Sequence, residues 1–171
     1  PMFCMLLRKH LSGGRIVELR QPPMERMVDL IMDCTDEMGE QVQKHLILEL
    51  MGRNSNLILC GGDGRVLDCL RRVDFEMSEK RQVLPGMRYE MPPAQDKINP
   101  LDETEEGFSA QAERANPDGA ADRFLVNTYL GLAPVTAREI VFTVCGRIDV
   151  TMSAMPANLL WKSFDKTCIH R

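Results

Sequence analysis

Between residues 15 and 70, short runs rich in Val, Ile and Leu alternate with turn residues. The runs cover residues 15–21, 25–33, 43–51, 55–60 and 65–70. Runs of this length and composition predict a series of antiparallel strands. Gly61-Gly62-Asp63-Gly64 separates the last two runs and predicts a hairpin, because glycine tolerates a positive φ. Pro22-Pro23 predicts the turn between the first two strands.

Helical patterns flank this strand region. Residues 1–11 predict a helix with Pro1 in its first turn and Gly13-Gly14 after its end. Proline-rich residues 84–100 predict an irregular segment. Residues 101–119 predict an acidic linker or a weak helix. Two further helices are predicted at residues 121–130 and 135–145, and an amphipathic stretch follows at 157–164.

These elements predict an α+β fold. We expect an antiparallel β-sheet sub-domain with an N-terminal helix over residues 1–100, followed by the linker. Residues 120–171 would form a helical hairpin sub-domain. The chain begins at Pro1 without an initiator methionine, and we therefore expect it to be part of a longer protein.

The composition is that of a globular protein, with 44% hydrophobic and 27% charged residues in a chain of 171. No run approaches the roughly 18 apolar residues of a membrane helix, so we expect no membrane partner. The net charge of −4 argues against nucleic acid if it is taken alone. However, most of the acidic excess lies in residues 101–171, so a local basic face in residues 1–100 remains compatible with it.

The candidate chemistry is sparse. Six cysteines form no CxxC pair and no zinc-like spacing with histidine, which favours a reducing, cytoplasmic setting and no metal site. The three histidines adjoin no nucleophile motif, and the glycines form no phosphate-binding loop. The sequence therefore predicts no enzyme and no cofactor.

Polar residues within the strand region are more informative. Glu49 interrupts an apolar run, and period-two alternation places it on the face opposite Leu48 and Leu50. Glu25-Arg26 opens another run directly after Pro22-Pro23-Met24. Two interpretations stay open: a recognition surface in which arginine binds phosphate or a base, or ordinary charge pairs at strand ends beside a polar turn.

Longer motifs carry a family resemblance. The segments Pro1–Leu11, Leu48–Leu59, Arg81–Gly86 and Pro92–Pro100, together with Tyr89, resemble the NFACT N-terminal domain, which is also catalogued as the fibronectin-binding protein A N-terminal domain. Within this family, the segments resemble those of bacterial ribosome-quality-control factors. Residues 1–100 would be the C-terminal part of that β-rich domain.

The resemblance implies a non-catalytic role in RNA handling. Members of the family bind obstructed large ribosomal subunits that carry peptidyl-tRNA, and they recruit alanyl-tRNA for an untemplated alanine tail. The expected partners are therefore tRNA and the large ribosomal subunit with peptidyl-tRNA. The alternative is a cell-surface adhesin that binds fibronectin, as the older family name says. The unpaired cysteines and the absence of a secretion signal count against that alternative.

The resemblance also supplies candidate tRNA-binding residues. The family's Asp-Arg pair falls on Glu25 and Arg26, where glutamate keeps the charge but adds a methylene. Its acidic-aliphatic-Met motif falls on Glu49, Leu50 and Met51, and the arginine of the following turn is Arg53.

The segment Gly131–Ile140 resembles the family's helical hairpin, which is similar to the helix-two-turn-helix of formamidopyrimidine-DNA glycosylases. Backbone N–H groups there could meet a phosphate, or the helices could simply pack. Those glycosylases use an N-terminal proline as nucleophile. Met2-Phe3-Cys4 replaces their acidic residues after Pro1, so we expect no glycosylase activity.

Overall fold

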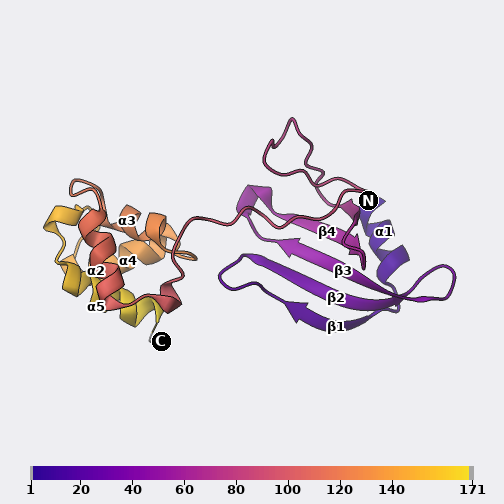
Figure 1. Cartoon of the computed structure of the whole chain (residues 1–171), viewed down its shortest axis with the longest axis horizontal. Helices are drawn as coiled ribbons and strands as arrows, with labels where there is room; N and C mark the ends of the chain where they lie inside the picture. Colours follow the sequence, from indigo (N-terminus) through magenta and orange to yellow (C-terminus); the bar gives the residue numbers. More distant parts are fainter. Residues whose placement is uncertain (1, 170–171) are drawn as a thin grey trace. The chain divides into compact units, whose positions relative to one another are not determined.

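The structure is a computed structural model that describes residues 2–169 (Figure 1). Pro1, which is predicted to lie in the first helical turn, is outside the described residues, as are His170 and Arg171. The chain divides into two compact units, the first ending at Pro93 and the second beginning at Ala94. The predicted α+β class is confirmed.

Unit 1 is an antiparallel meander preceded by one helix. Its elements are α1 (Met2–Leu11), β1 (Arg15–Arg20), β2 (Met27–Thr35), β3 (Gln41–Glu49), β4 (Asn56–Gly61) and β5 (Val66–Cys69). The strands follow one another in the sheet in the order β1-β2-β3-β4-β5. Figure 1 shows β1 to β4 side by side. The predicted Gly61–Gly64 hairpin is confirmed, since Gly64 has a φ of 77° and its N–H donates to the Gly61 carbonyl.

Two strands are shifted from their predicted positions. Both β2 and β3 extend toward the turn that joins them, where the Asp36 carboxylate accepts hydrogen bonds from the N–H groups of Met38 and Glu40. This Asx-type turn is tight, so the strands run up to Thr35 and start again at Gln41. At the opposite end, β2 begins at Met27 and β3 ends at Glu49, so residues 25–26 and 50–51 lie just outside the strands.

One face of the sheet is covered by residues 71–90, which contain no regular helix or strand. Alternation directs residues of β2, β3 and β4 to this face, where Met27, Ile47 and Ile58 are buried. Val83, from the covering segment, packs into the same core together with Tyr89. The long segment is therefore anchored to the sheet by apolar burial as well as by the polar contacts described below.

Unit 2 is helical. It comprises α2 (Glu105–Arg114), α3 (Ala121–Thr128), α4 (Pro134–Cys145) and α5 (Ala157–Cys168). An aromatic cluster fills its core, in which the rings of Phe108 and Tyr129 stack with centroids 5.8 Å apart. The Tyr129 hydroxyl donates to Glu103 at 2.8 Å. Helix α4 begins with Pro134 and ends at Cys145, and the following Gly146 has a φ of 68°, the left-handed C-cap conformation.

The linker predicted at residues 101–119 is not structureless, because it contains α2. Thr104 caps this helix by accepting a hydrogen bond from the Gly107 N–H, and Phe108 is completely buried in the core of unit 2. The polar composition concealed a helix that is fastened by a single large apolar residue. Helices α3 and α4 occur where the hairpin was predicted, but four helices form unit 2, and the helix-two-turn-helix detail stays a prediction.

Candidate functional site

The structure brings the two predicted motif segments to the same end of the sheet. Met27 lies opposite Glu49 in the register of β2 and β3. Just beyond this pair, the Leu50 N–H donates to the Arg26 carbonyl at 2.8 Å. Residues 25–26 and 49–51 are therefore neighbours, although the sequence separates them widely. We call this region the strand-end site.

The turn before Arg26 carries backbone strain. The Glu25 N–H donates to the Pro22 carbonyl at 3.1 Å, which closes a four-residue turn. Met24 has a φ of 58°, at a turn position that glycine usually occupies. The Arg26 side chain is exposed, and within residues 2–169 it forms no ion pair. The turn thus presents an unneutralised guanidinium to solvent.

The residues after β3 have different environments. Leu50 is 49% exposed, Met51 is half-buried, and Arg53 is exposed on the short 3-10 turn Gly52–Asn54. Glu49, by contrast, is only 2% exposed. Its predicted orientation away from Leu50 is confirmed, but its carboxylate lies beneath the covering segment rather than on the surface.

Glu49 is held by two residues of the covering segment. The Arg81 guanidinium donates to both carboxylate oxygens of Glu49, at 2.5 and 3.1 Å, and the Tyr89 hydroxyl donates at 2.8 Å. Arg81 also donates from Nε to the Glu90 carbonyl and lies over the Tyr89 ring, 5.2 Å from its centroid. This cluster supports the interpretation of a charge pair at a strand end, in a buried and bidentate form.

Burial raises the pKa of Tyr89 above its usual range, and the negative charge of Glu49 adds to the shift. Tyr89 therefore stays protonated and remains a donor to Glu49. Sequence analysis did not assign roles to Arg81 or Tyr89, although both fall in the motifs that carried the resemblance. Nothing local distinguishes them, because the contacts join residues 32 and 40 positions apart.

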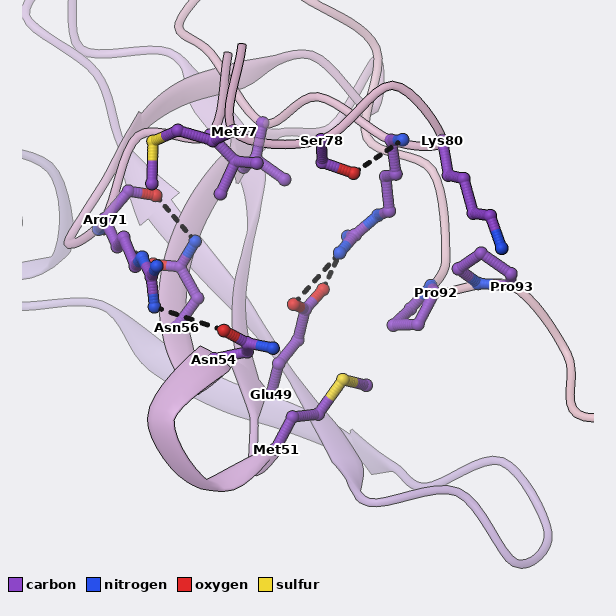
Figure 2. A pocket seen from close by; sticks show the side chains of 13 residues that line it. Glu49, Met51, Asn54, Asn56, Arg71, Met77, Ser78, Lys80, Pro92 and Pro93 are labelled. Atoms are coloured by element: carbon purple, nitrogen blue, oxygen red, sulfur yellow. Dashed lines mark hydrogen bonds and ion pairs between the residues drawn. The ribbon is translucent and has the colours of Figure 1, made fainter. Parts of the chain in front are cut away.

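A cavity of about 320 Å³ adjoins this cluster (Figure 2). Its walls combine apolar, amide and cationic side chains; the lining residues are Glu49, Met51, Asn54, Asn56, Arg71, Val73, Met77, Ser78, Lys80, Arg81, Val83, Pro92 and Pro93. Of the predicted residues, it includes Glu49 and Met51 but not Glu25, Arg26, Leu50 or Arg53. We call it the strand-end cavity.

A second cavity, of about 430 Å³, lies over the middle of the same face of the sheet. The His45 imidazole and the Asp29 carboxylate form a hydrogen bond there at 2.9 Å, and Cys60 lies opposite His45 in the register of β3 and β4. Burial raises the pKa of the Cys60 thiol to about 12. A thiol that stays protonated is a poor nucleophile, so Cys60, His45 and Asp29 do not form a reactive cysteine site.

Within residues 2–169, no cluster of His, Cys, Asp and Glu side chains could hold a metal ion. In the same part of the chain, no helix has the length and apolar character needed to cross a membrane. The potential phosphate contact at the start of α4 stays a prediction.

Unit 1 and its site define a class by structure: an antiparallel meander with exposed arginines and a polar cavity at its strand ends. The particular family follows from a match over almost the whole chain. Residues 1–167 match the family model described as "NFACT N-terminal and middle domains", and the chain belongs to this family.

Curated relatives agree with this assignment. The chain is 37% identical over 142 residues to a Bacillus subtilis protein named Rqc2 homolog RqcH, a match that covers 82% of this chain and 25% of that protein. It is 32% identical over 139 residues to the protein of the same name from Streptococcus suis, covering 81% of this chain and 25% of the relative. The chain thus spans about a quarter of the length of these relatives.

Two solved structures superpose on nearly the whole of this chain. The fibrinogen binding protein from Staphylococcus aureus superposes with a TM-score of 0.73 at 31% identity, over 99% of this chain and 60% of that chain. The N-terminal part of the fibronectin/fibrinogen-binding protein from Streptococcus suis superposes with a TM-score of 0.70 at 27% identity, over 96% and 58% of the two chains.

Proposed function

We propose that this chain is the tRNA- and large-ribosomal-subunit-binding module of a ribosome-associated quality-control factor. In this role it recruits alanyl-tRNA for untemplated tailing of stalled nascent chains. Membership of the NFACT family and the similarity to proteins named Rqc2 homolog RqcH support the proposal. The role is one of binding in the cytoplasm, without catalysis by this chain.

The observation that carries the proposal is the convergence of Arg26 with the end of β3. Arg26 and Arg53 are exposed cations from two separate segments, and the Leu50 N–H to Arg26 carbonyl bond ties those segments together. Exposed arginines bind phosphate groups through a planar fork of donors. A site that joins such cations to the exposed side chain of Leu50 suits an RNA backbone with an adjacent base or sugar.

The test uses the intact protein and purified large subunits that carry peptidyl-tRNA. Arg26→Ala should weaken tRNA retention and lower the slope of log affinity against log salt by about 1. Arg8→Ala is the matched control, because Arg8 is also exposed but lies on α1. If wild-type protein bound neither tRNA nor large subunits at low salt, the proposal would be wrong.

The second candidate is a fibronectin-binding adhesin. Its support is limited to the names of the similar solved structures, which are described as fibrinogen- or fibronectin-binding. Labelling of intact cells with a membrane-impermeant reagent separates the two candidates. Strong labelling of the exposed Cys4 in the native protein would favour the adhesin, whereas labelling only after lysis favours the ribosomal role.

A further inference from the structure

The strand-end cavity has an uneven balance of charge. Among residues 2–169, Glu49 is the only acidic residue that lines it, and its carboxylate is already bound by Arg81. Two further cations, Arg71 and Lys80, line the cavity without an acidic partner within residues 2–169. Once the Glu49–Arg81 pair has cancelled, the cavity carries two positive charges and therefore favours an anionic ligand.

Arg71 is fixed in place by neutral groups. Asn56, which is buried, donates to the Arg71 carbonyl at 2.7 Å and accepts from the Arg71 N–H at 2.9 Å. The guanidinium itself donates from Nη1 to the Arg53 carbonyl and to the Asn54 side chain. These acceptors orient the guanidinium without neutralising it, and its remaining N–H donors are free for a ligand.

The other walls are apolar. Met51, Met77, Val73 and Val83 line the cavity together with the rings of Pro92-Pro93. Figure 2 shows Lys80 beside Pro93, with Arg71 on the opposite side of the cavity. A free phosphate would satisfy the two cations but would leave this apolar surface unused. A ligand that combines a flat, largely apolar ring with flanking negative charges uses both.

We propose that the strand-end cavity takes one unpaired nucleotide of the bound RNA. The base would lie against Met51 and the Pro92-Pro93 rings, and Arg71 and Lys80 would hold the phosphates on either side of it. The volume of about 320 Å³ suits a single nucleotide and is too small for a base pair. This inference rests on the proposed RNA-binding function, and it adds Arg71 and Lys80 to the candidate residues.

The test compares two fluorescent RNA probes with the full chain: a stem-loop with unpaired loop nucleotides, and a duplex with the sequence of its stem. Arg71→Gln and Lys80→Gln should each weaken stem-loop binding several-fold and lower the salt slope by about 1. Met51→Ala removes an apolar wall without changing charge, so it should weaken stem-loop binding about fivefold or more at an unchanged salt slope. None of the three should alter duplex binding.

Arg8→Gln is the control, because it removes one exposed positive charge outside the cavity. Lys80 is exposed and forms no ion pair within residues 2–169, so Lys80→Gln should fold normally even if Arg71→Gln does not. If Lys80→Gln matched Arg8→Gln on both probes while wild-type protein bound tRNA, the cavity proposal would be wrong and the proposed function would stand. Loss of all tRNA and subunit binding in wild-type protein would overturn both.

Discussion

Replacement of Glu49 by glutamine tests the central contact of unit 1. Glutamine has nearly the same shape as glutamate but no charge, so Glu49→Gln removes the ion pair without creating a large cavity. The glutamine side-chain oxygen can still accept a hydrogen bond. Its NH₂ group, however, replaces the second carboxylate oxygen, so two donors face each other at that position. Arg81 would then be a buried guanidinium without a counter-charge.

The depth of the pair sets the size of the effect. The side chains of Arg81 and Glu49 are 12% and 3% exposed, and both carboxylate oxygens are used. Removal of one partner from a buried pair of this kind typically costs about 3–5 kcal/mol, because the remaining charge stays desolvated. We expect about 3 kcal/mol here, since glutamine keeps part of the hydrogen bonding. In a unit of this size, that loss lowers the Tm by about 12 °C or more.

Thermal or urea unfolding followed by circular dichroism measures the change. The chain offers a matched control, because Glu18 and Arg20 form a similar two-bond pair, at 2.6 and 2.7 Å, on the exposed strand β1. Exposed pairs contribute little, since water screens and solvates both charges. Glu18→Gln should therefore leave the Tm unchanged within error.

The refuting result is a Glu49→Gln variant that is as stable as Glu18→Gln. A double variant adds a second check: Glu49→Leu with Arg81→Met removes both charges, so it should be more stable than either single replacement. If the two single effects simply added in the double variant, the Arg81–Glu49 contact would not be the source of the loss.

Three further predictions address separate features. Tyr89→Phe leaves a buried carboxylate with one donor fewer and should lower the unfolding free energy by about 1–3 kcal/mol, measured by urea denaturation. Cys60 should stay unalkylated by iodoacetamide at pH 8, because its raised pKa keeps the thiol protonated, while the exposed Cys4 reacts. Mass spectrometry of the native chain measures both residues, and modification of Cys60 before Cys4 would contradict the prediction. In Gly146→Ala, the added Cβ has no other atom within 4 Å, but alanine must adopt a φ of 68°. The replacement should therefore destabilise unit 2 by about 1 kcal/mol in thermal melts. An unchanged Tm would show that the cap is not constrained.

The sheet could be predicted because its information is local. Apolar runs, a glycine-rich hairpin and a proline turn each act over a few residues, and together they predicted a run of antiparallel strands. Strand ends were less predictable. The Asp36 turn extends β2 and β3 at one end, and at the other end Arg26 and Leu50 lie outside the strands.

Helix α2 shows where composition misleads. The segment is acidic and polar, which is why it resembled a linker. Its start nevertheless has local signals: Thr104 as N-cap, followed by Glu105 and Glu106 in the first turn, where carboxylates interact favourably with the helix dipole. Packing of Phe108 among the other aromatic rings of unit 2 completes it, and that contact involves residues distant in sequence.

Only part of the candidate site could be predicted, because its contacts also join residues that are distant in sequence. Alternation placed Glu49 on the face opposite Leu48 and Leu50, but not beneath a covering segment. Its partners Arg81 and Tyr89 come from a segment without periodicity, so only the folded chain identifies them. A buried ion pair is a weak source of net stability, because desolvation offsets most of the attraction. Arg81 and Glu49 have a second effect, which is geometric: they attach residues 71–90 to the end of β3 in one register. That attachment fixes part of the wall of the strand-end cavity, since Lys80 directly precedes Arg81 and the Ser78 hydroxyl accepts a hydrogen bond from the Arg81 N–H. A charge-free Glu49→Leu, Arg81→Met variant that melted like wild type would therefore still be expected to lose discrimination between the stem-loop and duplex probes.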